Sequence, residues 1–116
     1  MEGGVGMTIG KLELAQWLID NLVKPAMGAD YYAPPSWDPL TNSDDARRVA
    51  CFMEQQGWKF KLQMKSTLSW EATFSKWDDK GSKGARGRCY GGLEESICYA
   101  AYFAILSMRA VEAVQP

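Results

Sequence analysis

Two neighbouring segments in the middle of the chain alternate apolar and polar residues with a period of two. In 58–65 the apolar side chains are Trp58, Phe60, Leu62 and Met64, and in 68–76 they are Leu68, Trp70, Ala72 and Phe74. This alternation predicts two strands, each buried on one face. Ser66 and Thr67 form a short link between them, so a hairpin is expected, and residues 86–90 are expected to add a third strand.

Three other segments show the helical period instead. The first helix is expected over 11–23, with Pro25 stopping it just beyond. Its predicted apolar stripe is Leu12, Ala15, Leu18, Ile19 and Leu22. The second helix is expected to begin at Asn42 or Ser43, which are residue types that cap helix starts, and to end at Gly57. The third is expected over 93–114.

The last of these helices carries apolar residues on two sides. One stripe is Leu93, Ile97, Ala100, Ala104, Met108 and Val111, and the other is Tyr99, Phe103 and Leu106. A helix that is apolar on two sides is covered on two sides. The second stripe is therefore expected to contact either the first helix or another subunit.

Together these elements predict an α+β fold in the order α-α-β-β-β-α, with a small antiparallel three-stranded sheet and helices on its apolar face. The 116 residues suffice to bury a core without disulfides or a metal. A single domain is expected over 11–116. It follows a flexible, glycine-rich start over 1–10, in which Met7 is a candidate initiator. The connection over 26–41 is expected to be packed down by its aromatic residues.

Charge and cysteine content narrow the functional classes. Thirteen basic and fourteen acidic residues give a net charge of −1, which predicts no long-range attraction to nucleic acid or membranes, although one face can still be basic. The odd number of cysteines favours reduced thiols and a cytoplasmic location, with Cys51 and Cys98 as buried helix residues and Cys89 elsewhere. The sequence has no apolar run of about 18 residues, so no membrane-spanning helix is expected.

The sequence contains few residue patterns that are typical of catalytic or metal sites. It has no histidine, which removes the commonest general base and most zinc sites. The acidic pairs Asp44-Asp45 and Glu94-Glu95 suit helix starts, and Asp78-Asp79 suits a solvated loop, better than a metal site. The glycines over 81–92 lack the spacing of a phosphate-binding loop. We therefore expect a non-enzymatic protein with no catalytic residue, metal or cofactor.

A basic surface is expected on the outer face of the hairpin. Its residues are Lys59, Lys61 and Lys65, with Lys76, Lys80, Lys83, Arg86 and Arg88 nearby, and the candidate anion-binding set is Lys59, Lys61, Lys65, Arg86 and Arg88. Such a face suits nucleic acid or another anionic partner, while runs of charge are more often simply solvated. Few aromatic side chains are expected there, so the stacking platform of single-strand binders is expected to be missing.

Aromatic and apolar side chains outside the predicted core form a candidate protein interface. They are Trp37, Trp77, Tyr90, Tyr99, Phe103 and Leu106. Aromatic residues are enriched at interface hot spots. The alternative is that these side chains cover the sheet edges and the core.

Several short motifs carry a likeness to a known family. They are Asn42-Ser43-Asp44-Asp45, Met53-Glu54, Gly57-Trp58, Trp70-Glu71-Ala72-Thr73-Phe74 and Ser96-Ile97-Cys98-Tyr99-Ala100-Ala101. Over roughly 20–106 the chain resembles the phage ABA sandwich family. That family has no established activity, so the resemblance implies a phage or mobile-element origin and assigns no role to any residue.

The element order is also similar to the double-stranded-RNA-binding domain. That family places lysines at the start of its last helix, where they bind phosphates. Here Glu94 and Glu95 stand in that place and would repel phosphate, so this mode of binding is excluded. The leading prediction is a phage or mobile-element module that binds a host or phage protein, or itself as a homodimer. The second is nucleic-acid binding through Lys59, Lys61 and Lys65.

Overall fold

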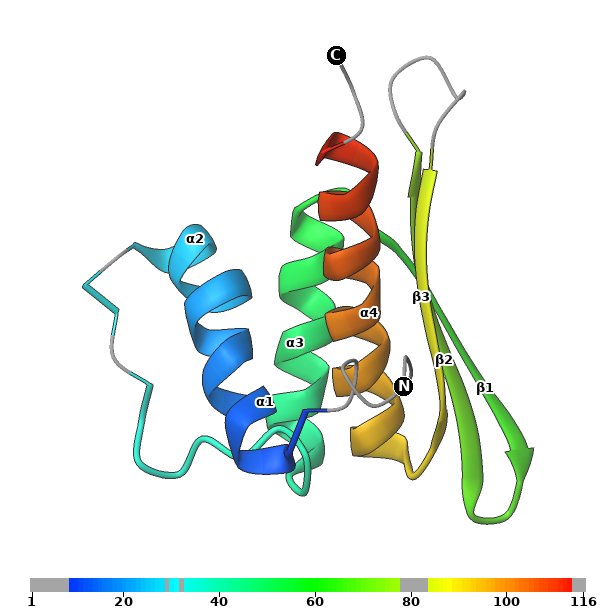
Figure 1. Ribbon diagram of the computed structural model, residues 1–116. Helices are drawn as coiled ribbons and strands as arrows, with labels where there is room; N and C mark the ends of the chain where they lie inside the picture. Colours follow the sequence, from blue (N-terminus) through cyan, green and yellow to red (C-terminus); the bar gives the residue numbers. More distant parts are fainter. Residues whose placement is uncertain (1–8, 29, 32, 78–83, 114–116) are drawn as a thin grey trace.

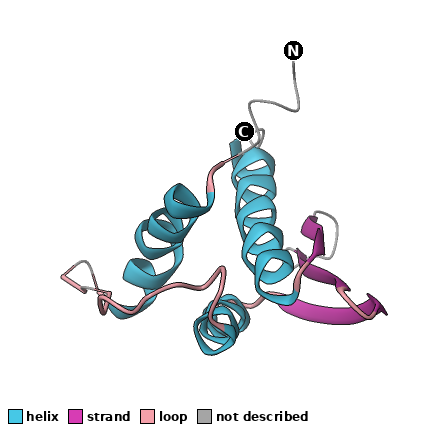
Figure 2. Cartoon of the chain, turned by 90° about the horizontal axis from the view of Figure 1, so that it is seen from below, coloured by secondary structure: helices cyan, strands magenta, loops and turns pink. Residues whose placement is uncertain are grey.

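The computed structural model describes residues 9–28, 30, 31, 33–77 and 84–113. The element order is α1 (Lys11–Leu18), η2 (Ile19–Val23, a π-helical turn), α2 (Lys24–Met27), α3 (Ser43–Gln55), β1 (Lys59–Ser66), β2 (Ser69–Trp77), β3 (Gly84–Gly91) and α4 (Leu93–Ala113). All helices lie on one side of a single sheet (Figures 1 and 2). The predicted α+β class and element order are confirmed.

The three strands form an antiparallel sheet in the order β1-β2-β3. The turn between β1 and β2 falls at Thr67 and Leu68, one residue later than the sequence pattern suggested. Leu68 was expected to point inward, but it is 84% exposed because it lies in this turn. Ala72 and Phe74 are fully buried, as the alternation predicts.

Helix α4 is the element that covers the inner face of the sheet, and small residues bring it very close to β3. A Cβ atom placed on Gly87 would lie 2.1 Å from the backbone nitrogen of Ala104 and 2.2 Å from the backbone oxygen of Ala100. Both alanines are fully buried. Only a residue without a side chain permits this approach, so Gly87 fixes the spacing between helix and sheet.

Helix α3 lies beside α4 and has the ends that the sequence predicts (Figure 1). The side-chain oxygen of Asn42 accepts a hydrogen bond from the backbone nitrogen of Asp45 at 3.0 Å, as in an N-cap. Gly57 follows the helix with a φ of 96°. The Nζ of Lys76 donates to the backbone oxygen of Gln56 at 2.8 Å. Lys76 therefore stabilises the C-terminal end of α3 and does not belong to the predicted basic surface.

The first helical segment runs farther than predicted. Pro25 was expected to stop it after Val23, but the chain stays helical to Met27 through η2 and α2. A π-helical turn is wider than an α-helical one and leaves room for the proline ring, which otherwise clashes with the preceding turn. Leu14 is buried in place of Leu12, which is 90% exposed.

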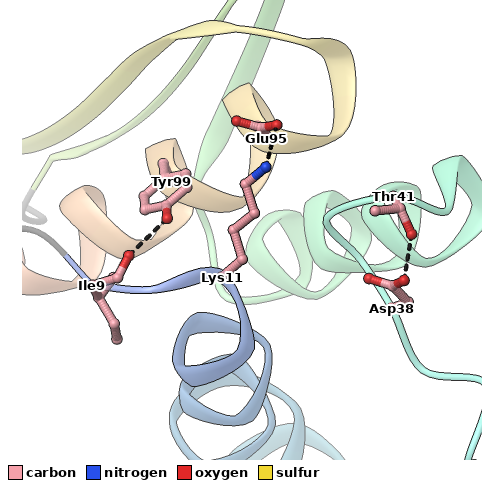
Figure 3. Close-up of polar contacts among 6 residues, drawn as sticks. All are labelled: Ile9, Lys11, Asp38, Thr41, Glu95 and Tyr99. Carbon is pink, nitrogen blue, oxygen red and sulfur yellow. Dashed lines mark hydrogen bonds and ion pairs between the residues drawn. The ribbon is translucent and has the colours of Figure 1, made fainter.

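The N-terminal helix and the residues before it contact α4 (Figure 3). The Tyr99 hydroxyl donates to the backbone oxygen of Ile9 at 2.7 Å, and Lys11 pairs with Glu95 at 3.0 Å. The rings of Trp17 and Tyr102 meet edge to face at 4.8 Å. Near Tyr99, the second apolar stripe of α4 thus contacts the segment just before the first helix. Residues 1–8 of the predicted flexible start lie outside the described residues, and Ile9 is anchored.

From Trp37 onward the connection between α2 and α3 is packed against the helices, as expected, whereas most of the described residues before Trp37 are exposed. Its Trp37 donates from Nε1 to the backbone oxygen of Ala15 at 3.2 Å. Leu40 is buried, and the backbone nitrogen of Asp38 donates to the Asp45 carboxylate at 2.8 Å. Asp38 also accepts a hydrogen bond from Thr41 (Figure 3). Asp45, at the start of α3, therefore also holds the preceding loop in place through this hydrogen bond.

We predict that Gly87→Ala destabilises the fold by about 1–3 kcal/mol, because the added methyl overlaps backbone atoms that cannot swing away. Urea unfolding of both proteins measures the change. Gly92→Ala is the matched control, since a Cβ there meets nothing within 4 Å. Equal unfolding midpoints for the two variants would contradict the close packing of α4 on β3.

Candidate functional site

The outer face of the sheet, turned away from α4, carries the predicted basic residues in register. Lys59 lies opposite Ser75, which lies opposite Arg86. In the next row of this face, Lys61 lies opposite Thr73, which lies opposite Arg88. Cations from β1 and β3 thus stand on either side of hydroxyl groups from β2. We call this surface the basic face, defined by Lys59, Lys61, Lys65, Arg86 and Arg88.

The basic face is hollowed and open to solvent. The hollow has a volume of about 360 Å³ and is lined by Lys59, Phe60, Lys61, Gln63, Glu71, Thr73, Ser75, Arg86 and Arg88. Within the described part of the chain, no helix lies over this side of the sheet (Figures 1 and 2). An open basic hollow suits an extended anion that lies along the sheet better than a small ligand that needs enclosure.

Among the described residues, one carboxylate lies between these cations. Glu71 occupies the row after Thr73, opposite Gln63 and Tyr90. Its oxygens lie 3.3 Å from the Nζ of Lys65 and 3.4 Å from a guanidinium nitrogen of Arg88. The sequence placed Glu71 facing water, but the residue is 8% exposed because these neighbours cover it.

The surroundings of Glu71 favour its ionised form. Its hydrogen bond with the Tyr90 hydroxyl lowers the pKa of the Glu71 carboxyl, and Lys65 and Arg88 lower it further. Partial burial acts in the opposite direction and is outweighed. Glu71 is therefore a fixed negative charge at one end of the basic face.

Two exposed aromatic residues also lie on this face, one at each end. Trp77 follows Ser75 on the same side of β2 and is 58% exposed. Its ring packs on Gly84, where a Cβ would come within 2.7 Å of it. Tyr90 lies at the opposite end and is 58% exposed, with the Arg88 guanidinium 5.9 Å from its ring centre. Sequence reasoning placed Trp77 in a loop because the strand was ended one residue too early.

The predicted protein-interface residues do not form one surface. Trp77 and Tyr90 lie on the basic face, while Trp37 and Tyr99 bond to the backbone of the N-terminal region. Phe103 and Leu106 line a separate hollow of about 400 Å³ beside β3, together with Arg86, Gly87, Arg88, Ser107 and Ala110. We call this second hollow the β3–α4 groove.

The cysteines differ from one another in their surroundings. Cys98 is buried, donates to the backbone oxygen of Pro39 at 3.2 Å, and has its pKa raised by burial, so its thiol stays protonated. Cys51 was expected to be buried but is exposed, because it lies on the solvent side of α3. Among the described residues, no three histidine, cysteine or acidic side chains come together as a metal site.

None of the helices in the described ranges has the length and apolar character needed to cross a membrane.

We predict that Glu71 stabilises the fold in a pH-dependent way. Its pKa is lower in the folded than in the unfolded protein, so its stabilising effect is complete above the unfolded value of about 4.3 and is lost as pH falls through the folded value. Urea unfolding of wild type and Glu71→Gln from pH 7 to 3 measures this effect. The difference in unfolding free energy should shrink in the acid range, and a constant difference would contradict the pairing.

Comparisons with protein-family models, with curated proteins and with solved structures give no match to this chain. The resemblance to the phage ABA sandwich family stays a prediction from the motifs.

Proposed function

We propose that this protein binds single-stranded nucleic acid on the basic face. The observation that carries the proposal is the arrangement of cations from β1 and β3 around the hydroxyl groups of β2, with exposed Trp77 next to them. Proteins that bind single strands combine a basic groove for the phosphates with aromatic rings on which bases stack. The basic face has both parts.

The shape of the surface favours a single strand over a duplex. A duplex keeps its bases stacked inside and is usually read by a helix or ribbon that enters a groove. The basic face is an open hollow in a sheet, and its exposed rings need unstacked bases as partners. A flexible strand can place phosphates over the cations and a base on Trp77 together.

The charge of the whole chain limits how such binding works. With a net charge of −1, the protein has little long-range attraction for a polyanion. Binding then depends on contacts within the basic face, where the ammonium and guanidinium groups meet the phosphates. We expect affinity that is modest, tolerant of sequence and sensitive to salt.

We predict that labelled single-stranded oligonucleotides bind at low salt and that the double variant Lys59→Gln/Lys61→Gln binds at least several-fold more weakly. Fluorescence anisotropy across a salt series measures both effects. Each lost phosphate contact should reduce the slope of log affinity against log salt by about 0.7.

Arg47→Gln is a matched control, because Arg47 is an exposed cation on α3, away from the sheet. Its affinity should equal that of wild type. A labelled duplex of the same length should bind more weakly than the single strand. Absence of salt-sensitive binding, or an equal loss from the control variant, would overturn the proposal.

A second candidate function is protein binding, and the β3–α4 groove favours it. Phe103 and Leu106 are half-buried apolar residues there, and Arg86 and Arg88 lie at its border. Apolar side chains rimmed by charge are typical of protein contact sites. In this proposal the chain is a phage or mobile-element module that binds a protein or a second copy of itself. The sequence motifs support that origin.

For the self-association form of this proposal, we predict a dimer in size-exclusion chromatography with light scattering. Phe103→Glu should shift it to monomer, since a buried carboxylate in the groove opposes contact. Ala110→Arg tests the same groove at an exposed position, in case Phe103→Glu unfolds. Met64→Glu, which changes an exposed apolar residue on β1, should leave the dimer intact. A monomeric wild-type protein would remove this form of the proposal.

A further inference from the structure

We propose that Glu71 is a built-in anion that occupies one half of the basic face and directs an incoming nucleic-acid strand to the other half. The inference rests on the proposed function and adds to it a residue that determines where on the sheet the strand lies. The occupied half consists of Lys65, Glu71, Arg88 and Tyr90. The open half consists of Lys59, Lys61, Arg86 and Trp77, with Thr73 and Ser75 between the cations.

In the occupied half, the donors already have a partner. Each oxygen of Glu71 faces a cation, with Lys65 at 3.3 Å and Arg88 at 3.4 Å, and Tyr90 lies opposite Glu71 on β3. Arg88 also lies over the Tyr90 ring. A phosphate that approached this half would have to displace a carboxylate tethered to the sheet, whose effective concentration is high.

The open half differs in how its cations are paired. Among the described residues, Lys59, Lys61 and Arg86 have no carboxylate within ion-pair distance. Lys59 and Lys61 are exposed, and Lys59 and Arg86 stand on either side of Ser75. Trp77, Ser75 and Arg86 line a common hollow at this end. Phosphate binding and base stacking are therefore both available next to each other here.

The two halves differ in what the loss of a cation should do. Removing Lys59 or Lys61 removes a contact with the strand. Removing Lys65 removes only a contact with Glu71, because the strand does not contact Lys65. Removing Glu71 itself leaves Lys65 and Arg88 without their anion, so that they become available to phosphate. The basic face would then bind over its whole length.

A double-mutant cycle on positions 65 and 71, read by single-strand affinity, tests the inference. In the wild-type background, Lys65→Gln should change the affinity less than about two-fold, while Lys61→Gln lowers it several-fold. Glu71→Gln should raise the affinity several-fold and steepen the salt slope by about 0.7 for each newly bound phosphate. In the Glu71→Gln background, Lys65→Gln should then lower the affinity several-fold.

A second comparison in the unaltered background covers the case in which Glu71→Gln does not fold. Trp77→Leu should weaken binding several-fold, and Tyr90→Leu should weaken it less. If wild type binds, but Lys65→Gln costs as much as Lys61→Gln, the inference fails and the proposed function stands. If neither wild type nor Glu71→Gln binds a single strand, both fail.

Discussion

The contact between β3 and α4 at Gly87 determines which side chains of the sheet face solvent. Because successive side chains of a strand point to opposite faces, the placement of Gly87 against α4 turns Arg86 and Arg88 outward. Residues that lie opposite one another in the antiparallel register share a face of the sheet. The same outer face therefore includes Thr73 and Ser75 of β2, and Lys61 and Lys59 of β1. A shift of one residue at this contact would bury the cations and expose the core.

The lysines of β1 have a second physical explanation, which the proposed function must accommodate. An edge strand attracts other strands, and outward lysines and bulges are common devices against such pairing. Lys59, Lys61 and Lys65 fit that role, and the register of β1 shifts between Met64 and Ser66. Edge protection, however, gives no reason to leave the indole of Trp77 exposed beside those charges. The aromatic residue is what distinguishes a binding surface from a protected edge.

The sequence predicted the sheet, its buried face and the cations of the basic face, because these depend on local alternation. It missed features that depend on distant contacts. Trp77 lies in β2 because Gly84 of β3 pairs with it, and nothing next to Trp77 in the sequence indicates this. Glu71 is covered by Lys65 and Arg88, which come from two other strands. The helix passes Pro25 because one turn widens before it, a local adjustment that residue type alone does not predict.

A tethered anion in a basic face has a structural effect as well as an electrostatic one. Lysine and arginine side chains lose considerable conformational entropy when they are held in one geometry. Glu71 orders Lys65 and Arg88 before any ligand arrives, and the paired cations in turn keep a nearly buried carboxylate ionised. The same carboxylate repels phosphates, so in the proposed binding mode the strand lies nearer to Trp77 than to Glu71.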